Sequence, residues 1–541
     1  MKRPSCLVIV FSFILSLSYE VIVAQETKKP NILFIAIDDL KPILGSYGDK
    51  LIKTPNIDRL AKIGTVFQSN YCQQAVCGPT RVSILTGKRP DYTRVWDLKT
   101  QMRDINPNIV SLPQFFITQG YTTQGLGKVY DSRSVDEKMD APSWSVPFYN
   151  YFKTEEKYYA IETGMPALGS YQLPETKELA IKYKQEAIDK GLKGGEVTDY
   201  VSKMIKPSVE SADVPDNAYN DGANALRAIE ILEKLKLESK PFFFAVGFSK
   251  PHLPFVAPKK YWDLYKREDM PVAPFQEKSI NGVDAAYHNS GEIRAYSDIP
   301  PLLSFTDQKD FGLTLTIDKQ KELIHGYYAA VSYADAQVGL LLNKLDELGL
   351  TKNTVIVLLG DHGWHLGDHN LWCKHSNFEQ ATKAPLIISA PGIAASVSKA
   401  PTEFVDVFPT LCDLAGIKIP ETLDGKSLKP LMNKKAKQVK EFSISQYPRS
   451  STNVETERQG YASSKVMGYS LRNKRYRYTI WMTNNFTSTQ PFKENLMVGA
   501  ELYDYKKDPN ETRNVVGDKK YKSTSIELKN KMLSFFQTQV K

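Results

Sequence analysis

Uninterrupted runs of hydrophobic residues, each ending in polar or charged residues, dominate the pattern of this chain. Three such runs cover Asn31–Ile37, Pro241–Phe248 and Thr354–Gly360. A short continuous apolar run is typical of a strand that is buried on both faces, as in a parallel sheet between layers of helices. Amphipathic helical patterns lie between the runs, from Asp221 to Leu237 and from Ile324 to Leu348. We therefore expect an α/β domain with a large, mostly parallel central sheet flanked by helices.

The pattern changes after a lysine-rich stretch at residues 429–440. Short strand patterns at 442–446, 467–471 and 476–481, followed by an amphipathic helical pattern at 523–540, predict a smaller antiparallel sheet with one helix. Residues between about 131 and 240 are rich in lysine and glutamate and are interpreted as insertions. The predicted organisation is a signal peptide over residues 1–24, a large α/β domain over 25–430 and a C-terminal α+β subdomain over 431–541.

The first 24 residues have the composition of a secretory signal. Lys2 and Arg3 precede an apolar core from Cys6 to Leu17, and Ile22–Ala24 forms a small-residue end. The apolar run is too short for a membrane span, and no second run of about 18 apolar residues follows. We expect an exported protein, periplasmic or secreted, without stable membrane insertion.

Composition and charge narrow the class of protein. The 541 residues are 42% hydrophobic and 24% charged, which is ordinary for a globular protein with room for two domains. The net charge of +9 suits an anionic partner, although most surface charge is only solvated. Beyond the signal, the cysteines are Cys72, Cys77, Cys373 and Cys412, too few for a disulfide scaffold.

Cys77 lies at the start of an apolar, helix-like run that ends in Thr86-Gly87. A helix beginning there would direct free backbone N–H groups and the positive end of its dipole toward Cys77, which makes a natural anion site. Arg81, one turn later, would add a guanidinium on the same side. The alternative is a buried cysteine in front of a core helix.

Two pairs of candidate metal ligands follow the buried runs. Asp38 and Asp39 come directly after the first run, and Asp361 and His362 directly after the third. Active groups of parallel sheets lie at the carboxyl ends of the strands, so the two pairs are expected at one edge. A mostly carboxylate set favours a hard divalent cation over zinc. The alternative is that adjacent acids in a turn are only solvated or capping residues.

Two further basic groups follow strand patterns. Gly125-Leu126-Gly127-Lys128 permits a close backbone approach and projects a cation, but it lacks the spacing of a phosphate loop. His252, between prolines after the second run, is either a rigid loop residue or a proton donor to a leaving oxygen near neutral pH.

The loop after the third run is unusually rich in histidine. Five of the seven histidines lie at position 252 or between 362 and 375. Most would be surface residues by default, but their concentration indicates a site. Trp364, His365 and Lys374 belong to this loop.

The spacing Cys77-x-Pro79-x-Arg81, with Thr-Gly five residues after the arginine, resembles the signature of the formylglycine-dependent sulfatases. The string Thr54-Pro55-Asn56-Ile57-Asp58-x-Leu60 is also similar to that family. The run from Lys250 to Phe255 resembles the branch that includes the iduronate-2-sulfatases. The segment from Asp508 to Asn514 resembles the family's C-terminal motif. The resemblance extends from residue 30 to about residue 520, with the region near 131–240 unaligned.

The resemblance implies an alkaline-phosphatase-like sulfatase fold, with residues 25–430 as the catalytic domain, and a specific chemistry. In that family the cysteine is oxidised to formylglycine (3-oxoalanine) by a formylglycine-generating enzyme, and the hydrate attacks the sulfur of a sulfate ester. The implied catalytic residues are Cys77, Arg81, Lys128, His252 and Lys374. The implied cation ligands are Asp38, Asp39, Asp361, His362 and Cys77, for Ca²⁺ or alternatively Mg²⁺. Lys250, Trp364, His365 and Asp131 are the expected substrate-binding residues.

The chain departs from this branch at Asp131, where relatives carry a histidine three residues after the lysine. A carboxylate cannot replace an imidazole that donates to a sulfate, so that role is empty or filled by another residue. We expect a sulfated polysaccharide or oligosaccharide, such as a 2-O-sulfated uronate or a related sugar, and no nucleic-acid partner. The alternatives are a phosphatase or phosphodiesterase of the same superfamily and a catalytically silent glycan-binding protein. Sequons begin at Asn485 and Asn510 and matter only in a eukaryotic secretory pathway.

Overall fold

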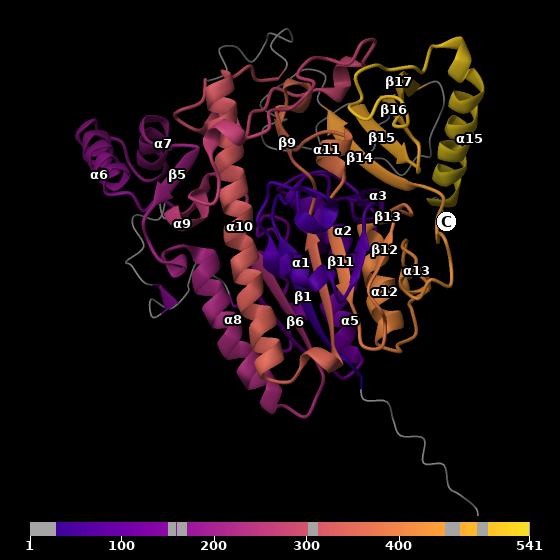
Figure 1. Ribbon diagram of the computed structural model, residues 1–541, viewed down its shortest axis with the longest axis horizontal. Helices are drawn as coiled ribbons and strands as arrows, with labels where there is room; N and C mark the ends of the chain where they lie inside the picture. Colours follow the sequence, from indigo (N-terminus) through magenta and orange to yellow (C-terminus); the bar gives the residue numbers. More distant parts are fainter. Residues whose placement is uncertain are drawn as a thin grey trace, which may run out of the picture.

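A seven-stranded sheet forms the centre of the molecule (Figure 1). The computed structural model describes residues 29–149, 158–159, 170–300, 312–449, 466–483 and 496–539, so the predicted signal peptide and the sequon at Asn485 lie outside the described residues. The strand order is β12-β2-β11-β8-β1-β6-β4, and only β11 runs against the others. The strands are β1 (Asn31–Ile37), β2 (Thr65–Phe67), β4 (Thr122–Gly127), β6 (Phe242–Phe248), β8 (Thr354–Gly360), β11 (Leu386–Ser389) and β12 (Ser396–Ser398). The predicted mostly parallel sheet is confirmed.

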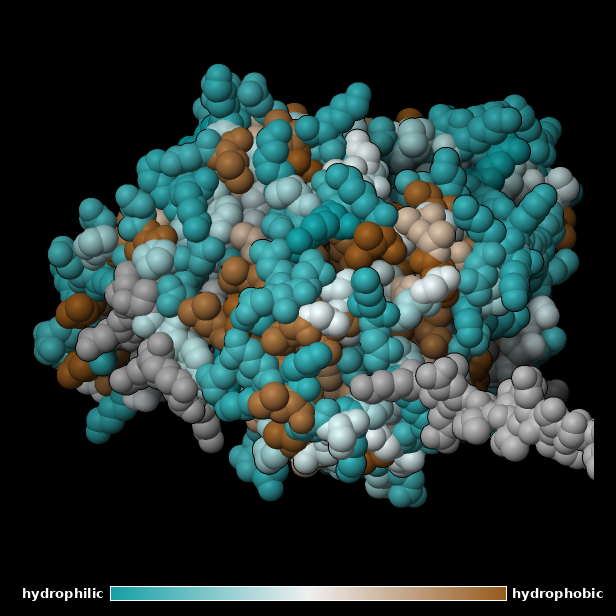
Figure 2. Space-filling view, turned by 60° about the horizontal axis from the view of Figure 1, so that its bottom comes forward, coloured by the Kyte–Doolittle hydropathy of each residue, from teal (hydrophilic) through white to brown (hydrophobic). Residues whose placement is uncertain are grey.

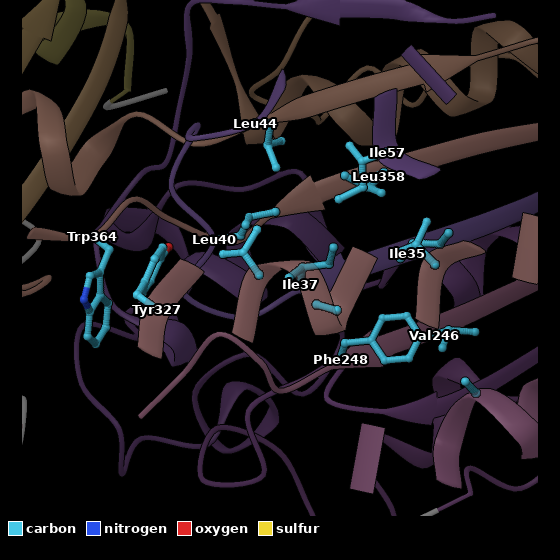
Figure 3. Packing of buried hydrophobic residues seen from close by; sticks show 14 of the residues in the cluster. Ile35, Ile37, Leu40, Leu44, Ile57, Val246, Phe248, Tyr327, Leu358 and Trp364 are labelled. Carbon is cyan, nitrogen blue, oxygen red and sulfur yellow. The ribbon is translucent and has the colours of Figure 1, made fainter. Parts of the chain in front are cut away.

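Alternate residues of β1 face two different hydrophobic cores, as the two-residue period of a strand requires. Leu33, Ile35 and Ile37 pack in one core with side chains from three helices, and Figure 3 shows part of this core, including Ile35 and Ile37. Ile32 and Phe34 pack in the other core, to which a different set of helices contributes. The helices of the first core are α1 (Pro55–Ala61), α8 (Asn220–Leu237) and α10 (Ile317–Glu347), and those of the second include α2 (Cys77–Thr86), α5 (Leu112–Thr118) and α12 (Val407–Leu414). Burial on both faces explains why the strand pattern is a continuous apolar run.

Helix α10 begins earlier than predicted, and one of its residues caps another helix. It begins at Ile317 rather than near Ile324, because the Thr316 side chain accepts a hydrogen bond from the Lys319 N–H and caps the helix. Within it, Asp335 accepts hydrogen bonds from the backbone N–H groups of Asn56 and Ile57, at 3.1 and 2.7 Å. The predicted cap of α1, Thr54, makes no such side-chain bond. A residue of a distant helix therefore caps α1.

Two smaller assemblies flank the central sheet, at opposite ends of the view in Figure 1. One assembly combines α6 (Pro174–Asp189), α7 (Gly195–Met204), β5 (Val209–Ala212) and β7 (Phe255–Pro258). The other is the predicted C-terminal antiparallel sheet, in the order β14-β15-β16-β17, with α15 packed against it. Its elements are β14 (Ser443–Arg449), β15 (Val466–Arg472), β16 (Tyr476–Met482), β17 (Met497–Asp504) and α15 (Lys522–Gln539). The boundary at residues 430/431 stays a prediction.

The strand β14 also contacts the segment that precedes α2. The Gln446 N–H donates to the Gln73 carbonyl at 2.7 Å, and the Ser445 hydroxyl donates to the Cys72 carbonyl at 2.6 Å. The C-terminal sheet thus covers the chain that leads to Cys77. The remaining short elements are α3 (Pro90–Thr93), α4 (Met102–Ile105), α9 (Lys259–Trp262), α11 (Glu379–Thr382), α13 (Lys429–Met432), β3 (Asn70–Tyr71), β9 (His365–Leu366), β10 (Trp372–Cys373) and β13 (Thr402–Glu403).

Hydrophilic residues break up the hydrophobic ones into small groups on the face shown in Figure 2. Among the described residues, none of the helices combines the length and the apolar character needed to cross a bilayer. The four cysteines of the described chain are all free and buried.

Candidate active site

The two predicted ligand pairs meet at the carboxyl edge of the central sheet. β1 and β8 are parallel neighbours with Ile37 opposite Gly360, so the residues that follow each strand emerge side by side. The Asp39 N–H donates to Asp361 Oδ1 at 3.0 Å, and His362 Nε2 lies 3.3 Å from Asp39 Oδ1. Asp38, Asp39, Asp361 and His362 are all fully buried, as the parallel-sheet argument predicts.

Cys77 is the first residue of α2 and points into this cluster. Its Sγ atom lies 3.4 Å from Asp38 Oδ1 and 3.5 Å from His362 Nε2. The thiol is 1% exposed. Burial, together with the charge of Asp38, raises the pKa of Cys77 well above its usual value, so the unmodified residue is a protonated thiol.

Arg81 joins α2 to both strand ends, one turn after Cys77. Its Nε donates to Asp361 Oδ2 at 3.0 Å and its Nη2 donates to Asp38 Oδ1 at 2.9 Å. Its Nη1 donates to the Val129 carbonyl at 3.0 Å and also to the carbonyl of Lys128. The guanidinium therefore fixes the position of two carboxylates and of the backbone after β4.

Two lysines from different loops pair with the adjacent carboxylates Asp38 and Asp39. Lys128 Nζ pairs with Asp38 Oδ2, and Lys374 Nζ lies 2.9 and 3.0 Å from the two Asp39 oxygens. Although burial acts against the charged form, Asp38 raises the pKa of Lys128 and Asp39 raises that of Lys374. Burial would raise the pKa of Asp38, but Lys128 and Arg81 hold it well below its usual range. Both lysines are therefore charged.

The donor set fits a hard divalent cation. One ligand atom from each of Asp39, Cys77 and His362 lies within 4.8 Å of the others, and the same holds for Asp38, Cys77 and Asp361. Three carboxylates and one imidazole supply mostly oxygen ligands, which Ca²⁺ and Mg²⁺ prefer.

His252 lies at the border of the cluster, beside Glu292, a carboxylate that was not predicted from the sequence. His252 Nε2 is 3.2 Å from Glu292 Oε1 and 3.7 Å from Asp39 Oδ2, while Nδ1 lies 2.6 Å from the Leu253 carbonyl. Glu292 Oε1 also lies 3.0 Å from Lys374 Nζ. Although burial opposes ionisation, Lys374 and His252 hold the pKa of Glu292 well below its usual value. Glu292 therefore bridges Lys374 and His252 as a carboxylate.

Lys250 and Trp364 contact the loops that carry two of the predicted catalytic residues. Lys250 Nζ donates to the carbonyls of His252 and Pro254 at 2.8 and 2.7 Å, and burial lowers its pKa to about 8. Trp364 is fully buried beside Tyr327, as Figure 3 shows, and the Lys374 ammonium lies 4.9 Å from the centre of a Trp364 ring. Both predicted substrate-binding residues thus hold the loops that carry His252 and Lys374.

His365 is not brought into the carboxylate cluster. Its Nε2 lies 2.8 Å from the Ser376 hydroxyl, and its ring packs near His288 and Phe378. Burial lowers the pKa of His365 well below its usual value, so it is a neutral, fully enclosed side chain.

Asp131, at the position of the expected histidine, is paired with Arg133. Arg133 Nε and Nη2 donate to the two Asp131 oxygens at 2.9 and 2.8 Å. Burial acts against ionisation, but the hydrogen bonds from Arg133 and the charge of Lys128 lower the pKa of Asp131 to about 2. Arg133 was not among the predicted site residues, although an arginine two residues after an aspartate can form a side-chain pair in a turn.

Comparisons with known proteins extend over nearly the whole chain. Residues 30–417 match the family described as Sulfatase, and residues 367–538 match N-sulphoglucosamine sulphohydrolase, C-terminal. Iduronate 2-sulfatase of Homo sapiens is 34% identical over 546 residues, covering 91% of this chain and 92% of the human protein. A sulfatase of Formosa agariphila is 30% identical over 521 residues, covering 94% and 87%. A solved protein in complex with its substrate D-glucosamine-2-N,6-O-disulfate has a TM-score of 0.66 at 22% identity, covering 95% and 98%. These matches confirm the predicted fold and resemblance.

Proposed function

Because the chain belongs to the sulfatase family and is a sulfuric ester hydrolase, we propose that it cleaves sulfate monoesters of carbohydrates with an oxygen nucleophile made from Cys77. The observation that carries this proposal is the position of Cys77. Its side chain is the first of helix α2 and lies within 3.5 Å of Asp38 and His362. Arg81 and Lys128 pair with Asp38, and Lys374 pairs with the adjacent Asp39.

The nucleophile is formylglycine at position 77, produced by a formylglycine-generating enzyme. When hydrated, this aldehyde supplies a hydroxyl oxygen in place of the sulfur atom. The Cys77 Sγ therefore stands where that oxygen would lie, and its contacts with Asp38 and His362 become contacts to a hydroxyl group.

The cation is Ca²⁺, with Mg²⁺ as the alternative, and Asp38, Asp39, Asp361 and His362 would hold it together with residue 77. When bound, it would lower the pKa of the attacking hydroxyl and polarise a sulfate oxygen. These carboxylates also hold Lys128 and Lys374 in place.

Arg81, Lys128 and Lys374 bind and orient the sulfate group. All three are cations that converge on the cluster, and each is held in place by a buried carboxylate. Fixed donors of this kind stabilise charge as it develops in the transition state, at about 3–4 kcal/mol for each donor that is lost.

His252 protonates the departing sugar oxygen. Nδ1 lies 2.6 Å from a backbone carbonyl, so Nε2, which faces the cluster, is the nitrogen that donates to the leaving group. Glu292 fixes the ring by its contact with Nε2.

A cavity beside these residues supports a carbohydrate as the leaving group. It has a volume of about 250 Å³ and is lined by Lys128, His252 and Lys250 together with Asn220 and Tyr219. Amide, hydroxyl and aromatic groups next to basic ones suit a sugar ring that carries a sulfate ester. The substrate class includes 2-O-sulfated uronates, since the relative of 34% identity is an iduronate 2-sulfatase. The protein would meet such glycans after export to the periplasm or the exterior.

The mass of the peptide that contains residue 77 tests the proposal directly. Conversion of the thiol side chain to an aldehyde lowers the mass by about 18 Da. In a host that carries the modifying enzyme, we expect this loss and turnover of an aryl sulfate in preference to an aryl phosphate.

The variant Cys77→Ala should fold normally but lose turnover. Cys412→Ala, which makes the same change at a buried cysteine of α12, is the matched control. An unmodified thiol in the active protein would refute the nucleophile, preferred turnover of the phosphate would indicate a phosphatase, and glycan binding without turnover would indicate a silent binding protein.

A further inference from the structure

A tight turn from Asp131 to Ser134 lies against the start of helix α2. The Ser134 N–H donates to the Asp131 carbonyl at 3.0 Å, which closes the turn. The Ser134 side chain faces Gly78, the residue after Cys77, so closely that a Cβ atom on Gly78 would lie only 2.4 Å from Ser134 Oγ. The turn is thus seated on the backbone next to the proposed nucleophile.

The chain before the turn is fixed to the same site. Arg81 binds the carbonyl groups of Lys128 and Val129, and Lys128 pairs with Asp38. After the turn, the Met102 N–H donates to the Ser134 carbonyl at 2.8 Å. The segment therefore has little freedom to move away from the sulfate-binding groups.

Within this turn, Asp131 holds Arg133 in one orientation. The carboxylate accepts from Nε and Nη2 of Arg133 at 2.9 and 2.8 Å and from its backbone N–H at 3.0 Å. The Asp131 side chain is 3% exposed, whereas the Arg133 side chain is 54% exposed. Among the described residues, the Nη1 group has no partner. A guanidinium whose inner edge is fixed thus presents its outer edge to solvent near the active site.

We propose that Arg133, positioned by Asp131, binds a second anionic group of the substrate, either a carboxylate or another sulfate, next to the ester that is cleaved. This inference rests on the proposed function, because it concerns the same substrate. Arginine suits the task because its planar fork binds such groups through two parallel hydrogen bonds. Asp131 stands where relatives carry a histidine, and Arg133, two residues farther along the chain, would take over the recognition of an anion.

The geometry of the pair also occurs elsewhere, which provides a control. Arg475 donates from Nε and Nη2 to Asp504 at 2.8 and 2.7 Å, and the side chains are 43% and 2% exposed. In that pair, Arg475 directly precedes β16, and Asp504 is the last residue of β17 in the C-terminal sheet. The two pairs differ in location, so Arg475→Gln makes the same change away from the active site.

The experiment compares competitive inhibition of aryl sulfate turnover by matched sugars. One arm compares a 2-O-sulfated glucuronide with the 2-O-sulfated glucoside, which lacks the carboxylate. The second arm compares a disulfated with a monosulfated glucoside. We expect the wild-type enzyme to bind the doubly anionic member of at least one arm more tightly, and the arm concerned identifies the anion.

Arg133→Gln should remove about 10- to 100-fold of that preference, the range for hydrogen bonds between charged groups. Arg133→Lys should retain part of it, and Arg475→Gln all of it. The inference is overturned if the wild type shows no preference in either arm, or if the preference survives in Arg133→Gln. Loss of the preference in Arg475→Gln as well would also overturn it. Absence of aryl sulfate turnover in the wild type would instead contradict the proposed function.

Discussion

The substitution Gly247→Ala should inactivate the enzyme from a position that touches no substrate. Gly247 lies in β6, opposite Gly127 of β4, and its Cα faces the backbone of Lys128. A Cβ atom at residue 247 would lie 2.1 Å from the carbonyl carbon of Lys128, 2.2 Å from its oxygen and 2.5 Å from the Val129 nitrogen. These are backbone atoms, so no flexible side chain can yield.

The required movement sets the size of the effect. Ordinary contact begins near 3.4 Å, so the Lys128 backbone must move by more than 1 Å. Arg81 binds the Lys128 carbonyl that would move, and the Lys128 side chain, which pairs with Asp38, would move with it. A misplacement of about 1 Å at a catalytic group costs about 100-fold in rate. Overpacking of this kind also costs about 1–3 kcal/mol of stability.

The assay is kcat/KM for an aryl sulfate, together with a thermal unfolding curve. Gly195→Ala is the matched control, since the first residue of α7 is exposed and a Cβ atom there meets nothing within 4 Å. We expect a loss of about 100-fold in Gly247→Ala, by the rule for misplaced groups, and none in the control. If a folded Gly247→Ala protein keeps kcat/KM within a few-fold of wild type, the argument that β6 fixes Lys128 is wrong.

Three further predictions concern Glu292, the proposed cation and Glu511. Glu292→Gln should lower kcat about 10-fold and alter its pH profile, because the neutral amide holds Lys374 and His252 less firmly than the carboxylate does; an unchanged profile would contradict the positioning role. Removal of divalent cations with a chelator should lower aryl sulfate turnover about 100-fold or more, since a metal ion contributes several kcal/mol of charge stabilisation. Added Ca²⁺ should restore it, and failure of both Ca²⁺ and Mg²⁺ to do so would refute the predicted cation. Burial raises the pKa of Glu511 to about 7, although Arg477 acts in the opposite direction. Its contribution to stability is therefore full below the ordinary pKa of about 4.5 and is lost as pH rises through 7, by about 3 kcal/mol. Wild type and Glu511→Gln should accordingly differ in the slope of unfolding free energy against pH between 4.5 and 7, and equal slopes would contradict the assignment.

The central strands and the residues at their ends were predictable, because burial on both faces of a strand produces a simple sequence pattern. β1 and β8 appear as continuous apolar runs, and the parallel arrangement of such runs places Asp38 and Asp361 at one edge. The start of α2 at Cys77 likewise follows from local pattern. These features depend on few residues that are close together in the sequence.

Glu292 could not be predicted, because its importance depends on tertiary contacts alone. It precedes a short 3-10 helix in a segment without regular periodicity, and more than 80 residues separate it from Lys374. Asp335 presents a similar case. The helical pattern shows that it lies in α10, but nothing local shows that it caps α1. Strand β17 was not predicted, because Gly499 and Ala500 have low strand propensity and interrupt the pattern.

The burial of Cys77 would determine when the proposed conversion to formylglycine can take place. The thiol is 1% exposed, and β14 covers the preceding segment through Gln446 and Ser445. The proposed modifying enzyme would have to reach Cys77 before α2 packs and before the C-terminal sheet, which is synthesised after α2, docks onto residues 72 and 73. On the proposed function, maturation would therefore be a race between modification and folding, and a chain that folds first would be trapped with an unconverted thiol. A slower-folding variant would give the modifying enzyme more time and a larger fraction of converted protein.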